Sequence, residues 1–165
     1  MATKSEKNLK EAFAGESQAN RKYLAFAKKA EAEGYKQAAK LFRAAAEAET
    51  VHAHNHLREF GGVKSTKENL EAAISGETFE FESMYPKMIS EAKAEGNALA
   101  ERTFVYANEV EKVHADLYKK ALETLGKNLE TDYFVCQVCG NTVEDHAPDE
   151  CPICGAKKQA FKKMD

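Results

Sequence analysis

One short motif, Glu-x-x-His followed by alanine, occurs twice in stretches that are rich in helix-forming residues. The first copy joins Glu49 to His52, and the second joins Glu111 to His114. Residues three positions apart lie on the same face of a helix. Each copy therefore directs one carboxylate and one imidazole to the same point, and two such helices can hold two metal ions between them.

The motif is embedded in a longer repeat of roughly sixty residues, which reads as a duplicated helix pair. Gly15-Glu16 in the first half aligns with Gly76-Glu77 in the second. Gly34 and Gly96 end the first helix of each pair and stand at the same distance from their motifs. The repeat predicts that each half contributes two helices and an equivalent set of side chains.

Four helices are predicted before residue 130, where the sequence is rich in Ala, Glu, Lys and Leu. Each ends at a glycine, the usual residue after a helix C-terminus. Pro86 is expected to kink the third helix, and Ser65 or Thr66 to cap its N-terminus. The expected spans are 5–33, 36–60, 66–95 and 98–125. Four long amphipathic helices favour a bundle.

Composition limits the function. The chain has 165 residues, is 43% apolar, and has a net charge of −3 with both signs interspersed. These values predict a globular protein and argue against nucleic acid or a membrane as its partner. The charged start, without an apolar run, predicts neither a signal peptide nor a membrane span. We therefore expect a cytoplasmic protein, in which clustered cysteines bind metal rather than form disulfides.

The helices supply a set of carboxylates and imidazoles that matches the ligand pattern of ferritin-like di-iron bundles. The candidate ligands are Glu16, Glu49, His52, Glu77, Glu80, Glu111 and His114. Oxygen donors with a few imidazoles suit iron or manganese. Glu80 breaks the internal symmetry, because Ala19 stands at the aligned position of the first half. Tyr23 and Tyr85 lie one or two turns from the ligands, where either can hydrogen-bond a ligand carboxylate.

The segment from 131 to 165 has a different composition and reads as a small domain held together by a metal. It contains two Cys-x-x-Cys-Gly knuckles, formed by Cys136 and Cys139 and by Cys151 and Cys154. Four thiolates at this spacing form a tetrahedral site for iron or zinc. Because the helical carboxylates and histidines suggest a redox centre, we favour iron at the four-cysteine site, with zinc as the alternative.

With both motif sets in place, the chain resembles the rubrerythrin family over nearly its whole length. The shared motifs are Gly15-Glu16-Ser17, Glu49-x-x-His52, Gly76-Glu77-x-x-Glu80, Met84-Tyr85-Pro86, Glu111-x-x-His114 and both knuckles. The resemblance implies a ferritin-like di-iron four-helix bundle over residues 1–130. It also implies a rubredoxin-like Fe(Cys)4 β/loop domain over residues 131–165.

The resemblance further implies the roles of the ligands. Glu49 and Glu111 would bridge two irons; Glu16 with either Glu80 or His52 would complete one, and Glu77 with His114 the other. The implied activity is reduction of hydrogen peroxide to water, with carboxylates or Tyr23 relaying protons. Electrons would come from NAD(P)H through a reductase and rubredoxin. The family is typically homodimeric, with the Fe(Cys)4 centre of one subunit near the di-iron site of the other.

Three alternatives stay open: a ferroxidase or iron-handling protein, an oxygen-reducing di-iron protein, and a scaffold with structural zinc. The attached four-cysteine domain argues against the ferroxidase. The sequence does not separate peroxide from oxygen as the oxidant.

The connection between the second and third helices is short for a bundle of this type. Only residues 61–65 separate the predicted helices. They span at most roughly 20 Å, whereas crossing from one helix end to the other needs roughly 37 Å at the helical rise. We therefore expect either a break near Gly76 or a dimer in which helix pairs are exchanged between chains, and we favour the exchange.

Overall fold

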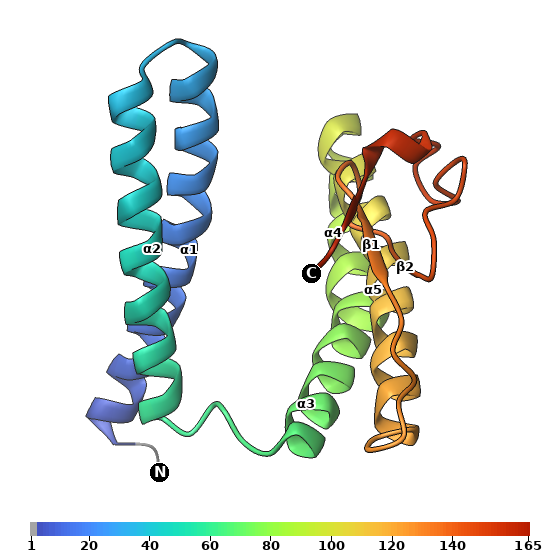
Figure 1. Ribbon diagram of the computed structural model, residues 1–165, viewed down its shortest axis with the longest axis horizontal. Coiled ribbons are helices and arrows are strands. Elements are labelled where there is room, and N and C mark those ends of the chain that lie inside the picture. The colour runs from blue at the N-terminus through green and yellow to red at the C-terminus, as the bar shows by residue number, and fades with distance from the viewer. Residues whose placement is uncertain (1–2) are drawn as a thin grey trace. The chain divides into compact units, whose positions relative to one another are not determined.

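The computed structural model describes residues 3–165, which divide into two compact units, one ending at Lys64 and the other beginning at Ser65 (Figure 1). The first unit is a helical hairpin. The second contains the remaining long helices and the small cysteine-rich domain. Within residues 3–165, no helix is both long and apolar enough to cross a lipid bilayer.

The hairpin consists of α1, Lys4–Ala32, and α2, Lys36–Glu59, in close agreement with the predicted spans. Gly34 makes the turn at a φ of 85°, a conformation that glycine adopts without steric cost. The amide of Tyr35 donates to the carbonyl of Ala30 at 2.8 Å, which satisfies one carbonyl at the end of α1. The predicted glycine stop is therefore confirmed.

Small side chains fill the contact between α1 and α2. The buried residues are alanines apart from Asn20; they are Ala27, Ala30, Ala39, Ala46 and Ala53. Alanine at a helix contact allows the two backbones to approach closely. Asn20 ties the helices together, because its side-chain amide donates to the carbonyl of Ala46 at 2.7 Å and to Oγ1 of Thr50 at 2.8 Å.

In the second unit, the predicted third helix is divided into three helical segments. These are α3, Thr66–Phe79, the π-helical segment η1, Glu80–Met84, and α4, Tyr85–Ala94. The last long helix, α5, spans Ala98–Glu123. Helix α3 continues through Gly76, so the structure has no break at the place that one alternative required.

The π-helical segment explains how the chain accommodates Pro86. Proline lacks an N–H and its ring clashes with the carbonyl four residues earlier. The amide of Tyr85 instead donates to the carbonyl of Glu80, five residues back, and Pro86 stands in the first turn of α4. The sequence predicted a disturbance at Pro86 but not this wide turn. The turn begins at Glu80, one of the candidate ligands.

Ser65 caps α3 through a reciprocal pair of hydrogen bonds with Glu68, as predicted for this N-terminus. We expect Ser65→Ala to lower the free energy of unfolding by about 1 kcal/mol, since one amide loses its acceptor. Chemical denaturation monitored by circular dichroism measures the change. Ser75→Ala, at an exposed position inside α3, is the matched control and should change stability little. Equal effects in both variants would contradict a capping role.

The small domain contains a three-stranded antiparallel sheet in the order β2-β1-β3. Its strands are β1, Tyr133–Cys136, β2, Thr142–Glu144, and β3, Phe161–Lys163, with a short 3₁₀ helix, η2, at Lys158–Ala160. Strand β1 contains three residues in succession that favour strands, Tyr133, Phe134 and Val135. Few side chains are buried, among them Cys136, Asn141 and Cys151. So small an apolar core cannot stabilise a domain by itself.

Candidate metal centres

The first cluster lies in the helical hairpin. Glu16 of α1 and Glu49 and His52 of α2 each offer a ligand atom, and these atoms lie within 4.8 Å of one another. Nδ1 of His52 is 3.0 Å from Oε2 of Glu49, one turn earlier on the same helix. The two carboxylates are half-buried and the histidine is exposed. The hairpin therefore brings together all three candidate ligands of the first half.

The second unit contains the equivalent cluster. Glu77 of α3 and Glu111 and His114 of α5 also place ligand atoms within 4.8 Å of one another. Nδ1 of His114 is 2.7 Å from Oε2 of Glu111, and all three residues are half-buried. The two clusters have the same composition and the same order along the chain, as the repeat predicts. Their oxygen and imidazole donors fit iron, manganese or zinc.

Electrostatics in the second cluster favour a cation. Burial raises the pKa of the Glu77 carboxyl above its ordinary value, and the neighbouring Glu111 carboxylate raises it further, against the opposing effect of His114. Burial likewise raises the pKa of Glu80, and the charge of Glu77 adds to the effect. Carboxylates held close together in a partly buried place repel one another, and a bound cation removes that repulsion.

The tyrosines differ in their surroundings. The ring of Tyr23 packs among aromatic side chains, at 6.3 Å from both Phe26 and Phe42 between ring centroids. Its predicted role as a proton relay stays a prediction. Tyr85 lies near the second cluster: burial raises the pKa of its hydroxyl, and the charge of Glu80 raises it further. Tyr118 was missed, although one helical turn from His114 places it on the same face of α5.

Tyr118 is sensitive to the same carboxylates. Burial raises the pKa of its hydroxyl, and the charges of Glu77 and Glu111 contribute as well. Two tyrosines therefore stand beside the second cluster. The four-residue spacing from His114 was the signal that could have identified the second of them.

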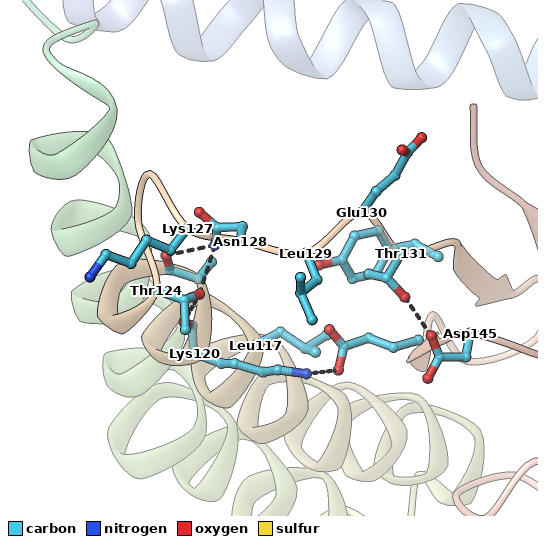
Figure 2. Close-up of a pocket in the computed structure, with 12 residues that line it drawn as sticks. Leu117, Lys120, Thr124, Lys127, Asn128, Leu129, Glu130, Thr131 and Asp145 are labelled. Carbon is cyan, nitrogen blue, oxygen red and sulfur yellow. Dashed lines mark hydrogen bonds and ion pairs between the residues drawn. The ribbon is translucent and has the colours of Figure 1, made fainter.

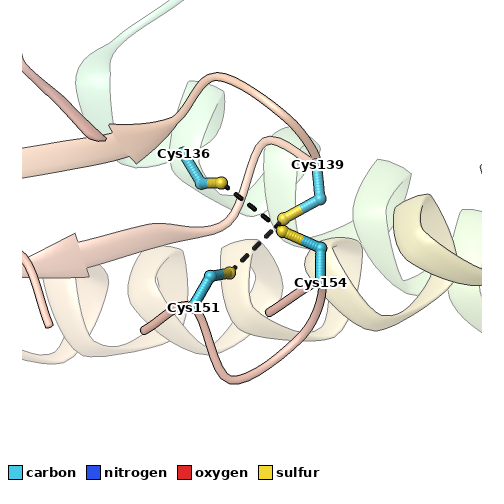
Figure 3. Close-up of side chains that lie close together, drawn as sticks. All are labelled: Cys136, Cys139, Cys151 and Cys154. Atoms are coloured by element: carbon cyan, nitrogen blue, oxygen red, sulfur yellow. Dashed lines mark hydrogen bonds between the residues drawn. The ribbon is translucent and has the colours of Figure 1, made fainter. Parts of the chain in front are cut away.

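The four cysteines converge on one point in the small domain (Figure 3). Sγ of Cys136 is 3.7 Å from Sγ of Cys154, and Sγ of Cys139 is 3.6 Å from Sγ of Cys151. A tetrahedral site with metal–sulfur bonds of about 2.3 Å has sulfur–sulfur distances of about 3.8 Å. The predicted four-cysteine site is thus in a geometry that fits a metal ion.

Hydrogen bonds to sulfur favour the thiolate at Cys151, whereas burial raises the pKa of the Cys139 and Cys154 thiols. Burial raises the pKa of the Cys151 thiol, but backbone amides of Cys154 and Ile153, with neighbouring thiols, outweigh it and lower the pKa to about 7. The side-chain amide of Asn141 also donates to Sγ of Cys151 at 3.8 Å. Asn141 is 2% exposed and was not identified from the sequence. Such donors stabilise negative charge on sulfur and influence the potential of a bound iron.

The small domain packs on α5 of its own chain. Oγ1 of Thr142 on β2 lies 3.0 Å from Nε2 of His114, and Gly140 approaches the side chain of Val110. The resemblance had placed the four-cysteine centre beside the other subunit's site. Within the second unit, the small domain lies against α5 of its own chain, and its position relative to another subunit stays a prediction.

A surface pocket of about 430 Å³ lies where α5 continues into the connecting segment of the small domain (Figure 2). Nζ of Lys120 pairs with Oε2 of Glu144 at 2.5 Å, and Thr131 donates to Asp145 at 2.7 Å. None of the candidate metal ligands lines it. The Lys120–Glu144 pair joins α5 to the small domain, the Thr131–Asp145 bond lies within that domain, and the candidate metal ligands lie elsewhere.

Comparisons with known proteins agree with this arrangement of sites. Residues 7–122 match the sequence profile of the Rubrerythrin family, and residues 134–162 match its rubredoxin-like domain. The chain is 37% identical to Rubrerythrin-2 of Clostridium acetobutylicum, with 93% of each sequence covered. It is 36% identical to Nigerythrin of Nitratidesulfovibrio vulgaris, covering 93% of this chain and 83% of that one. The structure of nigerythrin in its fully reduced, all-ferrous state gives a TM-score of 0.60 at 32% identity, over 99% of this chain and 88% of the other.

Fold and donor sets together define a ferritin-like di-iron carboxylate protein with an attached four-cysteine domain. The chain belongs to the rubrerythrin family. Members of this family are oxidoreductases with a di-iron site and a rubredoxin-like Fe(Cys)4 site. The predicted fold class, family and metal cofactors are therefore confirmed. The domain boundary at residue 130 and the role of each ligand stay predictions.

Proposed function

We propose that this protein reduces hydrogen peroxide to water, with electrons entering through the four-cysteine iron. The observation that carries the proposal is that the chain has two equivalent Glu/Glu/His clusters and a four-cysteine domain whose Thr142 contacts His114 of one cluster. When bound, two ferrous ions supply the two electrons that cleavage of the O–O bond requires. Two protons complete the conversion of one peroxide to two water molecules.

In this proposal the carboxylates organise the centre. Glu49 and Glu111 would each hold both metal ions, and their negative charge would offset the repulsion between the two cations. Glu16 with either Glu80 or His52 would complete one position, and Glu77 with His114 would complete the other. Glu80 is the extra carboxylate, and a half-buried carboxyl group at this position is the proposed first proton carrier. Tyr23 is the proposed second proton carrier.

The electron supply is proposed from the family and from the cysteine chemistry. We propose that an NAD(P)H-dependent reductase, acting with rubredoxin, reduces the four-cysteine iron, which then reduces the di-iron centre. Four clustered cysteines that bind a metal instead of forming disulfides suit a reducing compartment, and on that ground we propose that the protein is cytoplasmic.

The decisive experiment is anaerobic reduction of the iron-loaded protein followed by titration with peroxide. We expect one peroxide to reoxidise one di-iron centre. Glu111→Ala should slow this reoxidation by more than about 100-fold, which exceeds the usual effect of losing a residue that only hydrogen-bonds a metal ligand. Stopped-flow absorbance and iron analysis measure both quantities. Glu109→Ala, an exposed glutamate on the same helix paired with Lys112, is the matched control.

The same titration separates the alternatives. Wild-type reoxidation that is no faster than that of Glu111→Ala would contradict the peroxidase proposal. Faster reoxidation by dioxygen than by peroxide would favour an oxygen-reducing protein. Release of ferric iron from the bundle after each turnover would favour an iron-handling role.

We also propose that the protein is a homodimer in which helix pairs are exchanged. Two observations support it: α3 is continuous through Gly76, and the connection after Phe60 is too short for the crossing that a bundle needs. Each unit also leaves large apolar side chains exposed, such as Phe26 at 47% and Phe79 at 61%. Apolar faces of this kind need a covering partner. In the proposed dimer, the hairpin of one chain covers the second unit of its partner.

A further inference from the structure

Both ring nitrogens of His114 have a partner within the second unit. Nδ1 faces Oε2 of Glu111 at 2.7 Å, and Nε2 faces Oγ1 of Thr142 at 3.0 Å. Glu111 lies on the same helix, whereas Thr142 comes from β2 of the small domain. The imidazole is thus held from two directions by two different parts of the fold.

The partners of Thr142 determine the direction of the hydrogen bond. Its hydroxyl lies 3.3 Å from the carbonyl oxygen of Gly140, to which it can only donate. With its proton directed at Gly140, the threonine oxygen can accept a hydrogen bond, and on that basis we assign the ring proton of His114 to Nε2. This tautomer follows from the hydrogen-bond partners. It leaves the lone pair of Nδ1 directed at Glu111.

A lone pair and a carboxylate oxygen 2.7 Å apart repel each other unless a cation binds to both. Two neighbouring ligand atoms, each about 2.1 Å from one metal ion, are about 3 Å apart when they subtend a right angle. The observed separation is close to that value. The pair therefore has the spacing of two ligands of one metal, with a proton able to occupy the place of the metal.

His52, the equivalent residue of the first unit, has no such support. Its Nδ1 lies 3.0 Å from Glu49, but its Nε2 has no hydrogen-bond partner among residues 3–165. The His52 side chain is 54% exposed, compared with 26% for His114. The two clusters therefore have the same ligands but differ in how firmly the histidine is held.

We propose that Thr142 is a positioning residue that holds His114 in the Nε2–H tautomer with Nδ1 toward the metal. Strand β2 of the four-cysteine domain thereby makes His114 a permanently oriented ligand, whereas no described residue of this chain orients Nε2 of His52. The inference rests on the proposed metal role of His114, but not on peroxide reduction. The small domain would then have a second function, which is to orient His114, a ligand of the helical metal site.

Nuclear magnetic resonance of the full chain loaded with Zn²⁺ tests this assignment. Zinc is diamagnetic, so the Nε2–H of ¹⁵N-labelled His114 can be observed, with His114→Gln identifying its signal. We expect slow exchange of this proton with water in the wild type and in Thr142→Ser, and at least tenfold faster exchange in Thr142→Val. Zinc affinity of the helical site should fall 10- to 100-fold in Thr142→Val, the usual effect of losing such a partner.

Thr103→Val is the matched control, because Thr103 is an exposed residue of α5 whose hydroxyl bonds only its own helix backbone. The zinc affinity of the helical site should stay within threefold of the wild type in both Thr103→Val and Thr142→Ser. A protected Nε2–H in Thr142→Val, or an unchanged zinc affinity, would overturn the proposal. So would equal losses in Thr142→Ser and Thr142→Val, which would point to packing instead of the hydroxyl. No readout involves peroxide, so failure of the peroxidase assignment would be recognised separately.

Discussion

Replacing Cys151 by serine is expected to unfold the small domain while the long helices remain folded. The domain has three short strands and few buried side chains, so its folding depends on the metal. A structural metal held by four such ligands contributes about 10–16 kcal/mol to small domains of this kind. Loss of one thiolate from the tetrahedron in Figure 3 removes most of that contribution.

Amide hydrogen exchange measures the result segment by segment. We expect protection of residues 133–163 to be lost in Cys151→Ser, together with the ferric-thiolate absorption of the iron-loaded protein. Helical circular dichroism should change little. Val138→Ser changes an exposed residue within the first knuckle and should keep both protection and absorption. Equal protection in the two variants would show that the domain folds without its metal.

A heterodimer of one Glu49→Ala chain and one Glu111→Ala chain is expected to recover about half of the wild-type peroxide reduction if helix pairs are exchanged. Glu49 belongs to the first unit and Glu111 to the second. In an exchanged dimer, one site receives both substitutions and the other receives neither. Without exchange, each site contains one substitution and no intact site forms.

Two affinity tags allow the heterodimer to be isolated, and peroxide consumption under anaerobic conditions measures its activity. Each homodimer of a single variant should be inactive. A heterodimer with Glu111→Ala in both chains and the same two tags is the control, since no arrangement of its helices restores a site. A mixed heterodimer as inactive as this control would contradict the exchange.

Much of the fold follows from local sequence signals. Glycine ends four helical spans, and Gly34, Gly61, Gly96 and Gly126 all have positive φ in the structure. Helical periodicity brought Glu49 to His52 and Glu111 to His114, because residues three apart share a face. The two knuckles bring their four sulfurs together, since each places two cysteines on one tight turn. These features depend on residues close in sequence, or on motifs whose spacing is a geometric constraint.

Other features could not be predicted in this way. The π-helical turn at Glu80 depends on how the backbone rearranges its hydrogen bonds before Pro86. A kink and a π-helical turn are both compatible with a proline at this position. Asn141 has no motif that marks it as a donor to sulfur. Its role appears only when the turn after the first knuckle folds beside Cys151.

The sequence by itself determined the family, the two kinds of metal site and the six residues that form the two helical clusters, although the seventh candidate, Glu80, lies in neither cluster. Periodicity and spacing are local properties of the sequence, so they can be recognised without knowing how the helices and strands pack. Only the tertiary structure decided that β2 lies on α5, so that Thr142 meets His114 across 28 positions of the chain. That contact depends on how a strand of one domain packs on a helix of another. No local preference of either residue encodes it, yet it distinguishes His114 from its repeat partner His52.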